Sequence, residues 1–234
     1  MTQRFLEVSD LHAWYGESHV LHGVNFHVNE GEVLTLLGRN GAGRTSTLRA
    51  IMGLTGSRKG SIKVMGSETI SMATHTIARL GIGYCPEERG IFSSLTTEEN
   101  LKLPPELSKG GMGLEEIYAM FPNLKERSNS QGTRLSGGEQ QMLAVARILR
   151  TGARLLLLDE ISEGLAPVIV QKLAEMVRML RAKGYTIVMV EQNFRFAAPL
   201  ADRFLVMEHG AIQQEFTQDE LPQRLAKLHE YLGV

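Results

Sequence analysis

The sequence is poor in cysteine, in long apolar runs and in charge of one sign. Cys85 is the only cysteine among 234 residues, so an internal disulfide is excluded. No stretch reaches the roughly 18 consecutive apolar residues that span a bilayer, and the first residues, MTQRFLEVSD, lack the apolar core of a secretion signal. The 25 basic and 26 acidic residues nearly cancel, which argues against a nucleic-acid partner. We therefore expect a soluble, cytoplasmic chain.

Short apolar runs are present instead. Those at 32–38, 154–160 and 185–192 are too short for a helix that buries one face, and they predict parallel strands covered on both sides. Residues 167–183 place apolar side chains on one helical stripe, with a proline near the start and a glycine just past the end. Strand, helix and strand in succession predict an α/β fold with a mainly parallel sheet.

The remaining segments predict two additions to this core. The stretches FLEVSDL and VNFHVNEGEV alternate in polarity, which predicts N-terminal antiparallel strands at the edge of the sheet. Residues 97–150 become helical and are broken by LSKGGMG and SNSQG, which predicts a helical lobe. We expect a single domain over 1–234, with a core of 1–96 and 151–234 and a helical subdomain at 97–150.

A glycine-rich segment, LGRNGAGRTSTLRA at 37–50, follows the first predicted strand. Its glycines let successive backbone N–H groups turn around a phosphate at a helix N-terminus. These glycines are Gly38, Gly41 and Gly43. Thr45 supplies the hydroxyl expected to bind Mg²⁺, and Asn40 and Ser46 are expected to contact the nucleotide from the same loop. The structural alternative, a plain glycine-rich turn, is disfavoured by the strand before it and the helix after it.

Arg44 occupies the position at which this spacing normally carries lysine. Arginine keeps the positive charge but replaces a compact ammonium with a wider planar fork. We therefore predict that nucleotide binding is retained, with the rate of turnover left open.

The run RLLLLDE offers the second half of a nucleotide site. Asp159 leaves the carboxyl end of a buried strand, where it can hold Mg²⁺, and Glu160 beside it can polarise an attacking water. Acids at a strand end are often simple caps, but the P-loop upstream favours the functional interpretation. The seven histidines show no metal-ligand spacing, so Mg²⁺ is the only metal that the sequence predicts.

The segment LSGGEQQMLAVARIL joins a glycine pair to a long amphipathic helix. With the P-loop, it resembles the signature of ABC transporter ATP-binding subunits, and the likeness extends over nearly the whole chain. The resemblance implies a P-loop NTPase cassette that binds ATP. It also implies that Ser136, Gly137 and Gly138 touch the γ-phosphate of ATP held by a second cassette, identical or homologous. Free amides at a helix N-terminus supply the physical reason.

Other residues are carried over from the family one at a time. Tyr15 in HAWYGES resembles the aromatic residue that stacks on adenine. The segment GYCPEERGIFSSLTTEENL resembles the stretch that couples the nucleotide site to the membrane subunits, with Glu87 at a usual glutamine. Gln192 replaces the switch histidine, and glutamine cannot carry a proton through a change of charge. Ile161 and Ala166 stand at a usual proline and aspartate.

The segments PEERGIF, SEGLAP and VEQN together resemble the subfamily that serves branched-chain amino acid, amide and urea importers. The resemblance implies an ATPase on the inner face of the cell membrane, partnered by permease subunits and, indirectly, by an extracytoplasmic solute-binding protein.

Two alternatives remain open at this stage. One is a nucleotide-gated, weakly catalytic or non-catalytic cassette that depends on a partner ATPase subunit, as Arg44 and Gln192 would permit. The other is an ABC protein of translation or DNA repair, which would need tandem cassettes or long inserts that this chain lacks.

Overall fold

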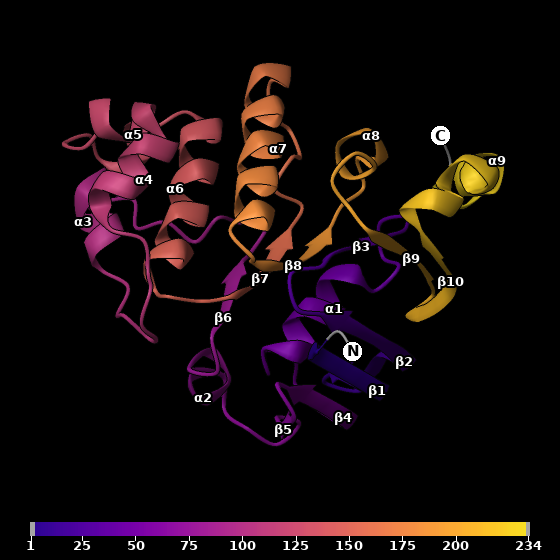
Figure 1. Cartoon of the computed structure of the whole chain (residues 1–234). Coiled ribbons are helices and arrows are strands. Elements are labelled where there is room, and N and C mark those ends of the chain that lie inside the picture. Colours follow the sequence, from indigo (N-terminus) through magenta and orange to yellow (C-terminus); the bar gives the residue numbers. More distant parts are fainter. Residues whose placement is uncertain (1–2, 233–234) are drawn as a thin grey trace.

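The computed structural model describes residues 3–232 and forms two β-sheets with helices between and around them (Figure 1). The antiparallel sheet has the strand order β2-β1-β4-β5, and the larger sheet has the order β10-β9-β3-β8-β7-β6. All neighbours in the larger sheet are parallel except β10, which is antiparallel to β9. The strands are β1 (Arg4–Tyr15), β2 (Ser18–Asn29), β3 (Val33–Leu37), β4 (Ser57–Val64), β5 (Ser67–Glu68), β6 (Ile82–Cys85), β7 (Leu155–Asp159), β8 (Thr186–Val190), β9 (Arg203–Glu208) and β10 (Ala211–Thr217).

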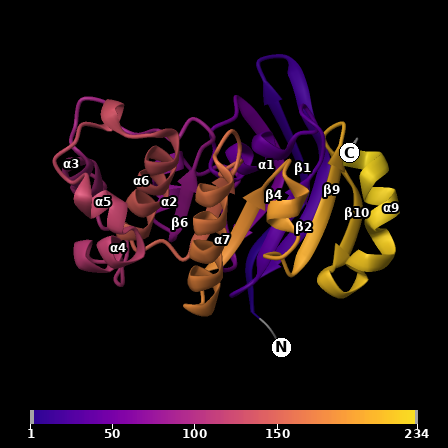
Figure 2. The ribbon, with the colours of Figure 1, turned by 90° about the horizontal axis from the view of Figure 1, so that it is seen from above.

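Helices cover both faces of the larger sheet. Figure 1 shows α1 between the two sheets and α6, α7 and α8 on the opposite face of the parallel sheet. The helices are α1 (Arg44–Ile51), α2 (Thr74–Ala78), α3 (Thr97–Lys102), α4 (Leu114–Met120), α5 (Pro122–Glu126), α6 (Gly137–Arg150), α7 (Pro167–Ala182), α8 (Phe194–Ala197) and α9 (Leu221–Leu232). Viewed from above, α3 to α6 gather at one end of the molecule and α9 at the other (Figure 2).

The parallel strands separate two hydrophobic cores because their side chains alternate between faces. In β7, Leu155 and Leu157 join the core shared with α1 and the antiparallel sheet, whereas Leu156 and Leu158 join the core under α6 and α7. All residues of β3, β7 and β8 are buried, as the continuous apolar runs predicted. The three strands and the helix at 167–183 are therefore confirmed.

The expected place of the N-terminal strands was wrong in one respect. They are antiparallel, but β1, β2 and β4 form a sheet of their own and do not extend the edge of the parallel sheet. The cause is burial, since one face of this sheet packs against α1 through residues such as Leu11, Leu21 and Leu48. The antiparallel edge strand of the parallel sheet is β10.

Residues 97–150 contain α3 to α6. The core beneath them continues from α6 to β7 and α7 without a break in packing. The boundary of a helical subdomain at 97–150 therefore stays a prediction. Among the helices of residues 3–232, none combines the length and the apolar character needed to cross a bilayer.

Candidate functional site

The glycine-rich loop connects β3 to α1 at the carboxyl end of the parallel sheet. At Gly38 an added Cβ would lie 2.5 Å from the carbonyl oxygen of Met207, so only glycine fits there. Gly43 caps α1 with φ of 103°, a left-handed conformation that side chains strongly disfavour. The loop therefore exposes its backbone N–H groups at the start of α1, as a phosphate-binding loop requires.

Thr45 and Asp159 meet although they are far apart in the chain. The Thr45 hydroxyl donates to Asp159 Oδ1 at 2.8 Å, and the Tyr84 hydroxyl donates to Asp159 Oδ2 at 3.0 Å. Burial raises the pKa of Asp159, against the opposing effect of these two hydrogen bonds. A hydroxyl and a carboxylate this close are hard oxygen donors that suit Mg²⁺.

Arg44 lies across the site and pairs with Glu160. Its Nη2 atom donates to Glu160 Oε1 at 2.7 Å and to Asn40 Oδ1 at 3.3 Å. The two paired side chains are 4% and 9% exposed. Among the described residues, the buried Nη1 atom of Arg44 has no hydrogen-bond partner. The guanidinium therefore keeps one donor free that a phosphate oxygen can accept.

Two further carboxylates lie close to Glu160. Oxygen atoms of Glu87, Glu160 and Glu163 all lie within 4.8 Å of one another. Burial, followed by the hydrogen bond with Glu163, raises the pKa of Glu160 to about 7, although Arg44 opposes the shift. Glu160 also has a left-handed backbone with φ of 48°, an uncommon conformation for a side-chain-bearing residue at a strand end.

A cavity of about 610 Å³ opens over the loop. It is lined by His19, Val20, His22, Asn40, Gly41, Ala42, Gly43, Arg44, Thr45, Ser46, Glu87, Glu160, Glu163, His209 and Gly210. The structure thus brings most of the predicted P-loop residues together with Glu87 and Glu160. Tyr15, 37% exposed at the end of β1, is not among the lining residues, and its contact with adenine stays a prediction.

The remaining predicted residues lie outside this cavity. Gln192 lines a neighbouring cavity of about 620 Å³, which shares Glu160 and Glu163 with the first. Ser136 caps α6, where its hydroxyl accepts from Glu139 N at 3.3 Å. A Cβ on Gly138 would lie 2.8 Å from the Ile169 side chain. The role of the signature segment in a second cassette stays a prediction.

Several residues of the site were not predicted from the sequence. Glu163 could have been predicted as a site residue, because it is a third carboxylate shortly after the same strand. No sequence pattern indicated Tyr84, since its contact with Asp159 depends on the pairing of β6 with β7. His19 and His22 lie on the β1–β2 hairpin and line the cavity. No sequence pattern indicated that this hairpin lies next to the P-loop.

Glu191 is a buried acid beneath the site. Its carboxylate accepts from the Ser162 backbone N–H at 3.2 Å and from the Ser162 hydroxyl at 2.7 Å. Burial raises the pKa of Glu191 from 4.5 to about 8 despite these two bonds. The folded chain therefore holds a proton that the unfolded chain releases between these values, so this group's contribution to stability falls as the pH rises through that window.

We expect Glu191→Gln to raise the melting temperature relative to wild type more at pH 9 than at pH 5. The amide stays neutral at both values, so it avoids the cost of burying a charge above the folded pKa. Each kcal/mol regained corresponds to about 2–4 °C for a chain of this size. Thermal unfolding followed by circular dichroism at pH 5, 7 and 9 measures the effect. A difference between the two proteins that is the same at every pH would contradict the assignment.

The loop, the threonine on a strand-end aspartate and the adjacent glutamate define a P-loop nucleoside triphosphatase. Comparison with known proteins gives the family, because the family model described as ABC transporter matches residues 21–163. The chain belongs to the ABC transporter family, as an ATPase cassette.

Individual relatives extend the likeness over the full length. The chain is 39% identical over 231 residues to the high-affinity branched-chain amino acid transport ATP-binding protein BraG of Pseudomonas aeruginosa, covering 97% of this chain and 99% of the relative. It is 34% identical to the probable branched-chain amino acid transport ATP-binding protein LivF of Archaeoglobus fulgidus, covering 92% and 93%. A solved structure described as the ATP binding subunit of an ABC transporter matches with a TM-score of 0.82 at 28% identity, covering 98% and 100%.

Proposed function

We propose that this chain hydrolyses ATP to energise an importer of branched-chain amino acids or related amides. The full-length identity of 39% to BraG is the observation that carries the substrate class. The pairing of Thr45 with Asp159 and of Arg44 with Glu160 supports the chemistry.

The site residues divide the work of hydrolysis between them. Thr45 and Asp159 would hold Mg²⁺, which neutralises charge on the phosphate oxygens when it is bound. Arg44 offers its unpartnered Nη1 donor to the phosphates. When the phosphates draw Arg44 away, Glu160 is released to orient and polarise the attacking water. Glu87 and Gln192 are proposed to help position that water.

A second cassette completes the proposed site. The signature residues Ser136, Gly137 and Gly138 lie outside the P-loop cavity of their own chain. They begin α6, where a capping box with Glu139 uses the Ser136 N–H and leaves the N–H groups of Gly137 and Gly138 to bind an anion. We propose that two cassettes, identical or homologous, close over two ATP molecules, with each signature segment on the other chain's nucleotide.

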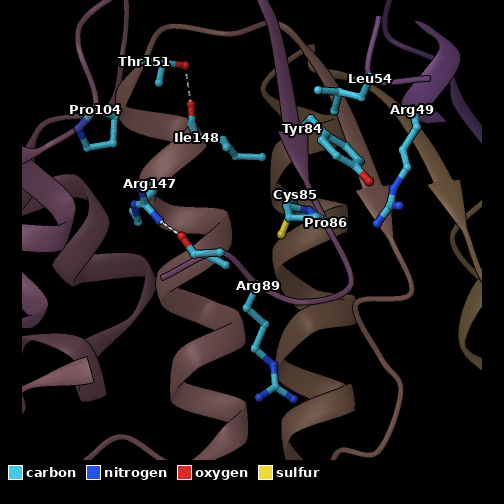
Figure 3. Close-up of a pocket in the computed structure, with 12 residues that line it drawn as sticks. Arg49, Leu54, Tyr84, Cys85, Pro86, Arg89, Pro104, Arg147, Ile148 and Thr151 are labelled. Carbon is cyan, nitrogen blue, oxygen red and sulfur yellow. Dashed lines mark hydrogen bonds between the residues drawn. The ribbon is translucent and has the colours of Figure 1, made fainter. Parts of the chain in front are cut away.

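A groove between α1, β6 and α6 is the proposed docking site for a permease subunit at the inner face of the membrane. This cavity of about 600 Å³ combines apolar side chains with three arginines, as Figure 3 shows. The apolar members include Leu54, Pro86, Pro104 and Ile148, and the arginines are Arg49, Arg89 and Arg147. This chemistry suits an amphipathic segment that carries an acidic side chain.

The groove is connected directly to the proposed metal ligands. Tyr84 forms part of its wall, and the hydroxyl of the same residue bonds to Asp159. A permease segment seated in the groove would therefore touch a side chain that contacts the proposed Mg²⁺ site. This connection supports a coupling between transport and hydrolysis.

Uptake of labelled leucine into proteoliposomes tests the proposal. The vesicles carry this chain and the cognate permease subunits, with ATP inside and a solute-binding protein outside. Leu54→Asp places a charge in the groove, and we expect it to abolish permease-stimulated hydrolysis and uptake while leaving the basal ATPase of the isolated chain unchanged. Met65→Asp, at an apolar residue 58% exposed on a different surface, is the matched control and should behave as wild type. Absence of uptake of both labelled leucine and labelled acetamide would overturn the proposed substrate class. Full coupling in Leu54→Asp would overturn the docking site.

Arg44→Lys is expected to raise the rate of ATP hydrolysis several-fold with a smaller change in ATP affinity. The loop's backbone amides supply much of the binding, whereas turnover depends on precise placement of the phosphates and on a free Glu160. Lysine removes the planar fork that contacts both Asn40 and Glu160. Steady-state hydrolysis and ATP titration of both proteins, with the permease subunits present, measure the two quantities. A fall in turnover would mean that the loop has adapted to arginine and would contradict the prediction.

A further inference from the structure

A cluster of histidines lies beside the P-loop cavity and takes no part in the proposed hydrolysis. It stands on the hairpin of β1 and β2, where His12 faces His22 and Trp14 faces His19 across the two strands. The register of this pairing shifts at Val20. Trp14 pairs with His19 and Ala13 pairs with Leu21, so Val20 is an extra residue on β2. Because of this bulge, His19 and His22, three residues apart, share one face of the strand.

The imidazoles of His12 and His19 bring two nitrogen atoms close together. His12 Nδ1 lies 3.0 Å from His19 Nε2, and the other nitrogen of His12, Nε2, lies 3.2 Å from Asp10 Oδ1. The Asp10 carboxylate can only accept from Nε2–H, and this leaves the Nδ1 lone pair of a neutral His12 directed at His19. A carboxylate on the far nitrogen of a metal-binding histidine is the usual arrangement in zinc sites.

We propose that His12 Nδ1 and His19 Nε2 bind one Zn²⁺ ion, with Asp10 orienting His12 and water filling the other positions. Two nitrogens on a tetrahedral zinc lie about 3.3 Å apart at a Zn–N distance of 2.0–2.1 Å. The present separation of 3.0 Å needs to open by only a few tenths of an ångström. Both side chains are reachable from solvent, since His12 is partly and His19 largely exposed.

A second histidine packs against the His19 ring. The His22 ring meets the His19 ring edge-on at 4.1 Å between centroids. Asp10 contributes a negative charge that offsets part of the charge of the cation.

Trp14 reports on this site directly. It is the only tryptophan in the chain, and its ring stacks on His19 at 4.3 Å with an angle of 11° between the planes. A change in the ligation of His19 therefore acts on the single indole fluorophore. Because His19 also lines the P-loop cavity, occupancy of the zinc site would affect nucleotide affinity, and the reverse would hold equally.

The test is a titration of the full, tag-free chain with ZnCl₂ in the absence of nucleotide. Isothermal titration calorimetry gives the affinity and stoichiometry, and Trp14 emission is followed in parallel. We expect one site per chain with a saturable change in emission. His12→Gln and His19→Gln should each weaken binding by at least about tenfold, and Asp10→Asn by about tenfold.

Two control variants locate the ion. His75→Gln removes a histidine on α2, remote in sequence from the hairpin, and Glu163→Gln removes one member of the carboxylate cluster, which is the competing place for a cation. Both should bind zinc as wild type does. The proposal would be overturned if zinc gave no saturable heat of binding. It would also be overturned if the heat of binding were unchanged in His12→Gln and His19→Gln. A heat lost only in Glu163→Gln would assign the ion to the carboxylates and would overturn it equally.

Discussion

Glu160→Gln is expected to reduce ATP turnover by at least about 100-fold while ATP binding persists, because the variant loses the carboxylate that is proposed to polarise the attacking water. The amide keeps the size of the side chain and an oxygen that can still accept the hydrogen bond from Arg44. The charge that pairs with the guanidinium is lost, so the phosphates of ATP should become its main partner. We therefore expect ATP to raise the melting temperature of this variant more than that of wild type.

Hydrolysis in the presence of the permease subunits, together with thermal shifts with and without ATP, measures both effects. Size-exclusion chromatography adds a third, since ATP that is bound but not hydrolysed should hold two cassettes together. Glu175→Gln, an exposed residue on α7 with the same chemical change, is the matched control and should resemble wild type. Turnover within threefold of wild type in Glu160→Gln would remove Glu160 from the proposed chemistry.

Asp159→Asn is expected to lower Mg²⁺-dependent hydrolysis by at least about 100-fold, which is about 2.7 kcal/mol of transition-state stabilisation. Its side-chain oxygen can still accept from Thr45 or from Tyr84, so the fold should be retained. Burial already raises the pKa of Asp159, and a neutral amide removes the cost of that buried charge. The melting temperature without nucleotide should therefore stay equal or rise.

ATP titrations with Mg²⁺ and with excess EDTA separate the two roles of the residue. We expect Asp159→Asn to lose the part of the affinity that depends on Mg²⁺ and to keep the part that does not. Thr45→Ala should show the same pattern, because it deletes the other oxygen of the pair. Tyr84→Phe keeps both oxygens, and its effect on hydrolysis should stay below tenfold. Normal Mg²⁺-dependent hydrolysis in both Asp159→Asn and Thr45→Ala would refute the metal-site assignment.

The Arg44–Glu160 ion pair gives a physical reason why the cassette could be weakly catalytic. In this pair the arginine balances the charge of the carboxylate that is proposed to act in hydrolysis. Lysine is a compact point charge without the two-armed geometry of the guanidinium. The response of turnover to Arg44→Lys therefore decides between a cassette that is slowed by this pairing and one that has adapted to it.

The sequence by itself determined the α/β class, the buried strands, the P-loop, the strand-end acids and the family. These features are written in contiguous residues, because apolar periodicity and glycine spacing act on the local backbone. The strand at 154–160 and the helix at 167–183 were predictable for this reason. The separate antiparallel sheet was not, because alternation in polarity reports that a strand has one buried face and does not report which element covers it.

Only the tertiary structure decided which side chains face one another. Arg44 and Glu160 are 116 positions apart, and Tyr84 reaches Asp159 because β6 and β7 are neighbours. His12 and His19 show no metal-ligand spacing in the sequence, yet the pairing of β1 with β2 and the bulge at Val20 bring their nitrogens together. Such contacts depend on strand order and register, which are set by packing across the whole chain, so no local pattern encodes them.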